Sequence, residues 1–134
     1  SNVENLTLSG SASINTNGNS LNNILTGNNS SNAIYGNNGN DTLIGNSGHD
    51  ILYGGLGNDQ LRGDSGNDIF KLNTGTGRDL ITDYTPGEDR IELLGDITES
   101  DLTFIYQSNN TSIKYQDDLL AIVENTISSD LTFI

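Results

Sequence analysis

The chain of 134 residues contains no cysteine, tryptophan or methionine, and it has a single proline and a single histidine. Without cysteine it has neither disulfides nor thiolate metal sites, so oxygen atoms are its plentiful metal ligands. No apolar run approaches the roughly 20 residues of a membrane-spanning helix, and no basic and apolar leader begins the chain. We therefore expect no membrane insertion, and we interpret the chain as one piece fused to a larger protein.

Positive charge is also scarce, because five Lys and Arg residues face eighteen Asp and Glu residues, for a net charge of −13. Such a chain has no basic patch, so we expect no nucleic acid and no anionic membrane as partner. Hydrophobic residues make up only 32% of the sequence. Low apolar content with high net charge is typical of disorder unless a ligand neutralises the charge, and hard cations such as calcium are the natural candidates.

Glycine is abundant and falls in a fixed register. From Gly18 the chain divides into six blocks of nine: GNSLNNILT, GNNSSNAIY, GNNGNDTLI, GNSGHDILY, GGLGNDQLR and GDSGNDIFK. Position one is always glycine and position eight is always apolar. The last four blocks add glycine at position four and aspartate at position six, namely Asp41, Asp50, Asp59 and Asp68. This period indicates a repeat architecture.

Physical reasons favour a stack of short strands. Six residues such as GNNGND suit a tight loop, because glycine and asparagine tolerate positive φ angles. The next three form a strand whose middle, apolar residue points inward. Two blocks make one turn, so Asp41 lies beside Asp59, and Asp50 beside Asp68. Such carboxylates repel unless a cation joins them, and calcium takes six to eight oxygen ligands.

Residues 18–71 resemble the RTX (repeats-in-toxin, hemolysin-type) calcium-binding nonapeptide GGxGxDxUx, in which U is a large apolar residue. The resemblance implies an all-β fold, a parallel β-roll (a right-handed β-solenoid of nonapeptide repeats), here with a C-terminal β-strand cap. It also implies Ca²⁺ ligands in the loops. Carbonyls of Gly36, Asn38, Gly55 and Gly57 would join Asp41 and Asp59, and those of Gly45, Ser47, Asp64 and Gly66 would join Asp50 and Asp68.

Further sites are predicted beside these two. GTGRDLIT resumes the motif after a short insertion, which pairs Asp59 with Asp79 and offers Asp83 as an extra ligand. Asn23 with Asp41, and Asn32 with Asp50, would form weaker sites of lower charge. The alternative for both asparagines, which we favour, is that their amides cap the loops without metal.

Other interpretations of the repeat fit less well. A flexible Gly/Asn linker, or a string of hairpin turns, does not explain an apolar residue at every position eight. An EF-hand fails because the aspartates at 64 and 68 are not followed by the required glycine and glutamate. His49 is expected to be a loop residue, and Asp117 and Asp118 a turn between strands. We therefore predict no enzyme active site.

The predicted organisation has four parts. Residues 1–17 form N-terminal strands that start the roll, 18–71 the calcium-binding roll, 72–95 a closing turn, and 96–134 a C-terminal β cap and possible secretion signal. DLTFI occurs at 101–105 and again at 130–134. We interpret this as shared strand chemistry, with paired strands in register as the alternative.

These observations predict a calcium-binding RTX module of a secreted bacterial protein, extracellular, that folds on calcium binding after type I export. The alternative is a carbohydrate-binding or adhesive module attached to a secreted enzyme or surface protein. A polysaccharide partner is then expected to be neutral, because the chain is acidic, and Tyr35 and Tyr53 at position nine would face it. The attached domain, in either case, would set the biological role.

Overall fold

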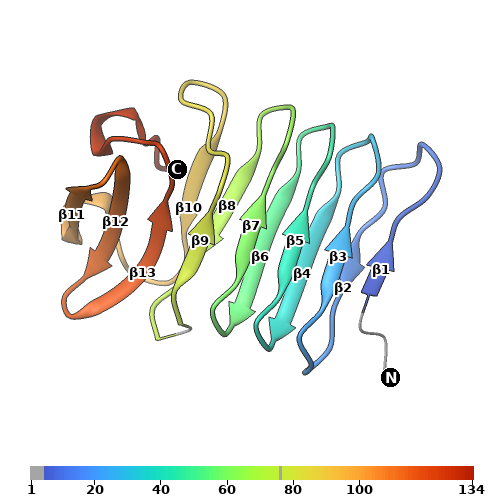
Figure 1. Ribbon diagram of the computed structural model, residues 1–134, viewed down its shortest axis with the longest axis horizontal. Coiled ribbons are helices and arrows are strands. Elements are labelled where there is room, and N and C mark those ends of the chain that lie inside the picture. Colours follow the sequence, from blue (N-terminus) through green and yellow to red (C-terminus); the bar gives the residue numbers. More distant parts are fainter. Residues whose placement is uncertain (1–4, 76) are drawn as a thin grey trace.

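The computed structural model describes residues 5–75 and 77–134, and it is a stack of parallel strands joined by loops at both edges (Figure 1). The all-β class and the parallel β-roll are confirmed. Residues 1–4 of the predicted N-terminal segment, and Thr76, lie outside the described residues. Within the described ranges there is no helix long and apolar enough to cross a membrane.

Two sheets face each other across a thin core. The eight-stranded sheet runs in the order β1 (Asn5–Thr7), β3 (Ile24–Thr26), β5 (Thr42–Ile44), β7 (Gln60–Arg62), β9 (Asp79–Ile81), β13 (Asp118–Val123), β12 (Asn110–Tyr115) and β11 (Leu102–Gln107). The five-stranded sheet runs in the order β10 (Arg90–Leu93), β8 (Ile69–Leu72), β6 (Ile51–Leu56), β4 (Ala33–Asn38) and β2 (Thr16–Asn17). Consecutive blocks therefore alternate between the sheets.

The register follows the nonapeptide. Leu25 pairs with Leu43, and Leu43 with Leu61, in the eight-stranded sheet. Ile34, Leu52 and Phe70 pair in the same way in the other sheet. All six are at most 1% exposed, so position eight of each block forms the core. Because each strand contributes one inward side chain, stability depends on stacking between turns.

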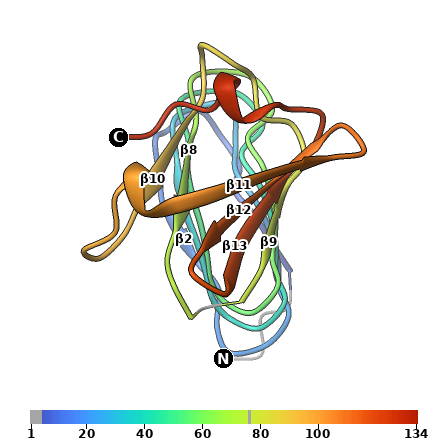
Figure 2. The ribbon, with the colours of Figure 1, turned by 90° about the vertical axis from the view of Figure 1, so that its left-hand side faces the viewer.

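The roll continues beyond the nonapeptides. β9 pairs in parallel with β7, and β10 pairs in parallel with β8, so residues 72–95 add a further turn to both sheets. Ile81 and Ile91 are fully buried in the same core. β13 then pairs in parallel with β9, while β12 and β11 follow in antiparallel order and cover the end of the stack (Figure 2).

The two DLTFI segments do not pair with each other. Each begins at the last residue of a 3₁₀ turn, η1 (Glu99–Asp101) or η2 (Ser128–Asp130), and its backbone becomes extended at the leucine that follows. The first becomes β11, at the end of the eight-stranded sheet, and the second bridges β10 through Phe133 and Ile91. Phe104 and Phe133, the same position in both copies, pack with ring centroids 5.8 Å apart. The repeated segment thus terminates both sheets and joins them.

Candidate metal centre

Buried aspartates form a row along each edge of the roll. Asp41 and Asp59 immediately precede strands of the eight-stranded sheet and Asp79 begins one, whereas Asp50, Asp68 and Asp89 immediately precede strands of the other sheet. These six side chains are between 0% and 4% exposed. Carboxylates are almost never buried to this extent without partners or a metal, so each row requires an explanation.

Within each row, every aspartate is joined to the one in the next turn. The backbone N–H of Asp41 donates to Oδ1 of Asp59 at 2.7 Å, and that of Asp59 donates to Oδ1 of Asp79 at 3.2 Å. At the other edge the N–H of Asp50 donates to Oδ1 of Asp68 at 2.8 Å. The predicted pairs Asp41 with Asp59, Asp50 with Asp68 and Asp59 with Asp79 therefore lie in adjacent turns.

The second carboxylate oxygens are left without partners. Among the described residues, Oδ2 of Asp41, Asp50, Asp59 and Asp68 is buried and accepts no hydrogen bond. A buried acceptor without a partner costs about 1–3 kcal/mol, and more when it is charged. Four such atoms in one small domain point to a ligand that is a cation.

The position-one glycines allow these oxygens to approach the backbone closely. A Cβ added to Gly36 would collide with Oδ2 of Asp41 and with the carbonyl oxygen of Gly54 in the next turn. Gly45 relates in the same way to Oδ2 of Asp50 and the carbonyl of Gly63. A carboxylate oxygen and a carbonyl oxygen thus converge at Gly36 and at Gly45, which matches the oxygen ligands that calcium prefers.

Backbone oxygens have to complete any site here. No group of three or more His, Cys, Asp or Glu side chains within 5–75 and 77–134 is arranged to hold a metal alone. The carbonyl donors implied by the family resemblance lie in adjacent loops of the same edge. Asn37 pairs with Gly55 in β4 and β6, and a bridge joins Ser47 to Ser65. The loops therefore supply backbone oxygens close to the aspartate pairs.

The first two blocks differ from the last four. Oδ1 of Asn32 accepts the N–H of Asn28 at 2.9 Å, and its Nδ2 donates to the carbonyl of Ile14 at 2.7 Å. Oδ1 of Asn23 likewise accepts the N–H of Asn19 at 2.8 Å. The Oδ1 atoms of both side chains thus cap the loops of their own blocks. This is the capping role that the sequence analysis favoured for these two asparagines.

Backbone conformation separates the same two groups of blocks. Positive φ angles occur at position two and position four only from Gly36 onward, at Asn37, Gly39, Asn46, Gly48, Gly55, Gly57, Asp64 and Gly66. In the first two blocks, positions two and four are not left-handed. The loop shape that accompanies an unpartnered aspartate oxygen is therefore confined to the last four blocks.

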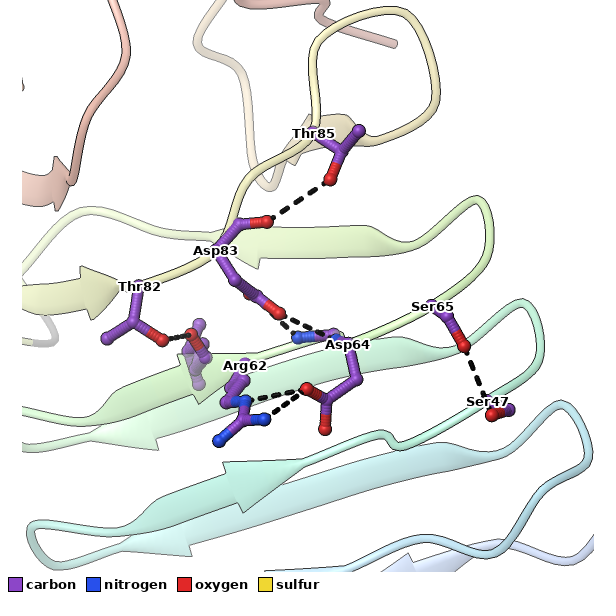
Figure 3. A network of polar contacts seen from close by, with 9 residues as sticks. Ser47, Arg62, Asp64, Ser65, Thr82, Asp83 and Thr85 are labelled. Atoms are coloured by element: carbon purple, nitrogen blue, oxygen red, sulfur yellow. Dashed lines mark hydrogen bonds and ion pairs between the residues drawn. The ribbon is translucent and has the colours of Figure 1, made fainter.

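Asp83 is not where the sequence interpretation placed it. It was expected beside Asp59 and Asp79, but it follows the three-residue strand β9 and so lies at the opposite edge. There its carboxylate accepts the N–H of Gly63 at 3.0 Å and that of Asp64 at 2.7 Å (Figure 3). Asp64 in turn forms an ion pair with Arg62 (Figure 3). Asp83 therefore holds the last regular loop and is not part of the Asp59 and Asp79 pair.

The pKa values of the buried aspartates lead to the same conclusion as the hydrogen bonds. Burial raises the pKa of Asp68 to about 7; the N–H of Asp50 lowers this pKa, and the charges of Asp89, Asp50 and Asp83 raise it. Burial and the charge of Asp59 raise the pKa of Asp79 to about 8. Burial also raises the pKa of Asp41, Asp50 and Asp59. The protein without metal therefore disfavours ionised carboxylates here, whereas a bound cation would favour them.

Asp89 is the residue that the sequence interpretation missed. Its Oδ1 accepts the N–H of Asp68 at 2.9 Å, as Oδ1 of Asp68 does from Asp50. The separation is 21 residues rather than 18, so a search at the nonapeptide period passes over it. The sequence feature that could have identified Asp89 is the segment GEDRIEL, in which an aspartate directly precedes a short strand pattern, as in the regular blocks.

Comparisons with known proteins agree with this geometry. Residues 17–52 and 35–70 match the family model of the RTX calcium-binding nonapeptide repeat. The AlgE6R3 subunit of the Azotobacter vinelandii mannuronan C5-epimerase is similar over 100% of this chain and 84% of its own, at 25% identity and a TM-score of 0.65. The AlgE6R2 subunit of the same epimerase is 22% identical over 92% of both chains, with a TM-score of 0.62.

A third similar structure is part of a much longer protein. The extracellular lipase LipA from Serratia marcescens aligns with 88% of this chain at 19% identity and a TM-score of 0.68. The aligned region is only 20% of the lipase chain. A comparison with curated protein sequences gives no match.

Proposed function

Because residues 17–70 belong to the family of RTX calcium-binding nonapeptide repeats, we propose that this chain is a module of a larger secreted protein whose folding is driven by calcium. The repeats of this family bind calcium ions and are not catalytic by themselves. The observation that carries the proposal is the set of four buried, unpartnered oxygens of Asp41, Asp50, Asp59 and Asp68. Each oxygen lies against a position-one glycine, where a Cβ would collide with it.

Three sites follow from the joined aspartate pairs. Asp41 and Asp59 hold the first, Asp50 and Asp68 the second, and Asp59 and Asp79 the third. The carbonyls assigned by resemblance complete the first two: Gly36, Asn38, Gly55 and Gly57, and Gly45, Ser47, Asp64 and Gly66. Bound calcium supplies positive charge and coordination to oxygens that the protein leaves unsatisfied. We place no ion at Asn23 or Asn32, because their amides cap their own loops.

Coupling to folding follows from the thin core and the charge. The net charge of −13 and the buried carboxylate rows oppose the compact state when no cation is present. Sites of about 10⁻⁴ to 10⁻³ M affinity stay empty in a bacterial cytoplasm and fill in extracellular calcium. The chain therefore crosses the membrane in expanded form by type I export and folds outside. The similarity to part of an extracellular lipase supports this location.

Circular dichroism with and without calcium tests the proposal. We expect a weaker strand signal and a lower free energy of unfolding in chelator than in calcium, with a cooperative gain of strand when calcium is added in the millimolar range. Asp59→Asn removes one charge shared by two sites and should shift the transition to higher calcium, whereas Asp96→Asn, an exposed residue, should not. Equal strand content in chelator and in calcium would overturn calcium-driven folding.

One observation favours a second function, the binding of a neutral polysaccharide. Tyr35 pairs with Tyr53 in β4 and β6, and each follows a buried residue, so the two rings lie side by side on the outer face. Aromatic rings on a flat sheet suit stacking against sugar rings. A glycan screen in calcium tests this idea, with Tyr53→Ala expected to abolish any binding. Binding that survives this substitution would exclude the tyrosine face.

A further inference from the structure

Charge is distributed unevenly along the chain. Residues 5–40 contain no Asp, Glu, Lys, Arg or His. All the basic residues, and all the acidic residues except Glu4, follow residue 40, and Glu4 lies outside the described residues. Residues 5–40 include β1, β2, β3 and β4, which stand together at one end of the stack (Figure 1). This end of the roll is therefore built from uncharged residues, whereas the remainder carries the negative charge.

The uncharged end has open strand edges. β1 ends the eight-stranded sheet and β2 ends the five-stranded sheet, and among the described residues no strand pairs with their outer edges. The N–H of Leu8 donates to the carbonyl of Thr26 in β3 at 2.8 Å. Because bonding alternates along a strand, the N–H and C=O of Thr7 face the open edge. Such unpaired backbone groups are a template for pairing with another strand.

Apolar side chains are also exposed at this end. Leu6 packs against the core but is only half-buried. Ile14, Leu21 and Ile24 are between 41% and 47% exposed. The terminal repeats of a solenoid require a polar outer face to stay soluble and separate. The described residues of this end present apolar groups and free backbone edges instead.

The opposite end of the roll is closed. The N–H of Ile91 in β10 donates to the carbonyl of Thr132 at 2.8 Å, and the N–H of Ile134 donates to the carbonyl of Ile91 at 3.0 Å, so residues 131–134 cover the outer edge of β10. The turn η1, with two acidic residues, directly precedes β11 at the end of the other sheet. A covering segment and nearby charges both oppose edge pairing between copies. Neither occurs at β1 or β2 within the described part of the chain.

We propose that two copies of this chain associate end to end through β1 and β2, related by a two-fold axis. Charge identifies the occupant, because two chains of net charge −13 repel each other wherever their acidic surfaces meet. A two-fold axis places the same uncharged end on both sides of the contact, so open edges meet without facing like charges. Short edge strands form a small contact, so we expect a weak dimer, with a dissociation constant of about 10⁻⁵ to 10⁻³ M.

This association goes beyond the proposed function and involves none of the proposed calcium sites. No ion is placed in the first two blocks, whose asparagines cap their own loops. Calcium therefore contributes only by keeping the rest of the roll folded. A failure of calcium-driven folding and a failure of the dimer are distinguishable, because the first is measured by strand content and the second by mass.

Sedimentation equilibrium in saturating calcium tests the proposal. We expect the wild-type chain to form dimers as its concentration rises, and added NaCl to favour them by screening the repulsion between the acidic bodies. Thr7→Glu introduces a charge at an exposed residue of β1 and should raise the dissociation constant at least about tenfold. Thr103→Glu is the matched control, with the same charge at an exposed residue of β11, and should leave the constant unchanged.

Three results of this experiment would overturn the proposal. They are a monomer at every concentration and salt, equal weakening by both substitutions, and a dimer that only Thr103→Glu weakens. The last result would place the contact at β11.

Cross-linking gives a second measurement that introduces no charge. The chain has no cysteine, so one introduced thiol marks one position. A short bifunctional maleimide should join Thr7→Cys chains in pairs, because a two-fold axis through this end brings the two copies of the residue together. Thr103→Cys chains should remain single. Both variants are first shown to match the strand signal of the wild-type chain in calcium. Pairs of Thr103→Cys, or no pairs of Thr7→Cys, would contradict the contact through β1.

Discussion

The backbone N–H of Asp41 donates to Oδ1 of Asp59 across one turn of the roll, 2.7 Å away, while Oδ2 of both residues stays buried without a partner. One oxygen of each carboxylate is thus used to hold adjacent turns together. The other is left for a ligand. The same aspartates therefore hold the turns together and offer an oxygen to the metal. We expect stability to change when an aspartate charge is removed and also when the cation is removed.

Asp68→Asn should change stability in opposite directions with and without calcium. Asparagine keeps an oxygen for the N–H of Asp50 and removes a buried charge. In chelator at pH 8 we expect it to stabilise the chain by about 1–3 kcal/mol, the usual cost of an unsatisfied buried group. In saturating calcium it should destabilise the chain by a similar amount. Urea unfolding in both buffers measures this, and destabilisation in both would contradict the account.

Without metal, stability should fall as the pH rises. Burial raises the pKa of Asp68 to about 7 and that of Asp79 to about 8, from 3.8. The folded chain therefore binds more protons than the unfolded chain between about pH 4 and pH 8, so the free energy of unfolding decreases across this window. We expect higher urea midpoints at pH 5 than at pH 8 in metal-free buffer. Asp68→Asn should make the urea midpoint depend less on pH. A pH dependence identical to that of the wild-type chain would show that other groups cause it.

Gly57→Ala should be far more damaging than Gly87→Ala. Both glycines have positive φ, 138° and 82°, so alanine costs roughly 1–2 kcal/mol of backbone strain at each. At Gly57 the new Cβ would also collide with the carbonyl of Gly39 in the previous turn, whereas nothing lies within 4 Å at Gly87. We expect a loss of at least about 3 kcal/mol at Gly57, measured by thermal unfolding in calcium. Equal losses would show that the turns do not stack this closely.

Phe104 and Phe133 should be energetically coupled. Their rings pack at 5.8 Å and join the ends of the two sheets. Each alanine variant is expected to lose about 2–4 kcal/mol, and the double variant to lose about 0.5–1.5 kcal/mol less than the sum. A double-mutant cycle in calcium measures the coupling. Strict additivity would mean that the two copies of DLTFI close the roll independently.

The repeat in the sequence was sufficient to predict the roll and its aspartate pairs. Position eight gave the buried Leu43, Leu61 and Phe70, and position six gave aspartates that lie in adjacent turns. This worked because the 18-residue register is set by one physical pattern, a loop of glycines followed by a single inward side chain.

The prediction failed where the period stops. Asp83 was assigned to the wrong edge, because it follows β9 rather than preceding it. Asp89 was missed because the loop before β10 has a different length. The order of β11, β12 and β13 depends on side-chain packing at the end of the stack, which no local pattern encodes.

The most direct test of the account is the free energy of unfolding as a function of free calcium. Each site adds about 1.4 kcal/mol per tenfold rise in calcium above its dissociation constant, so three coupled sites add about 4 kcal/mol per decade. We predict a slope of this size for the wild-type chain in the millimolar range, and a smaller slope for Asp59→Asn, which lies in two of the sites. A free energy of unfolding that does not change with calcium would contradict the claim that these aspartates couple metal binding to folding.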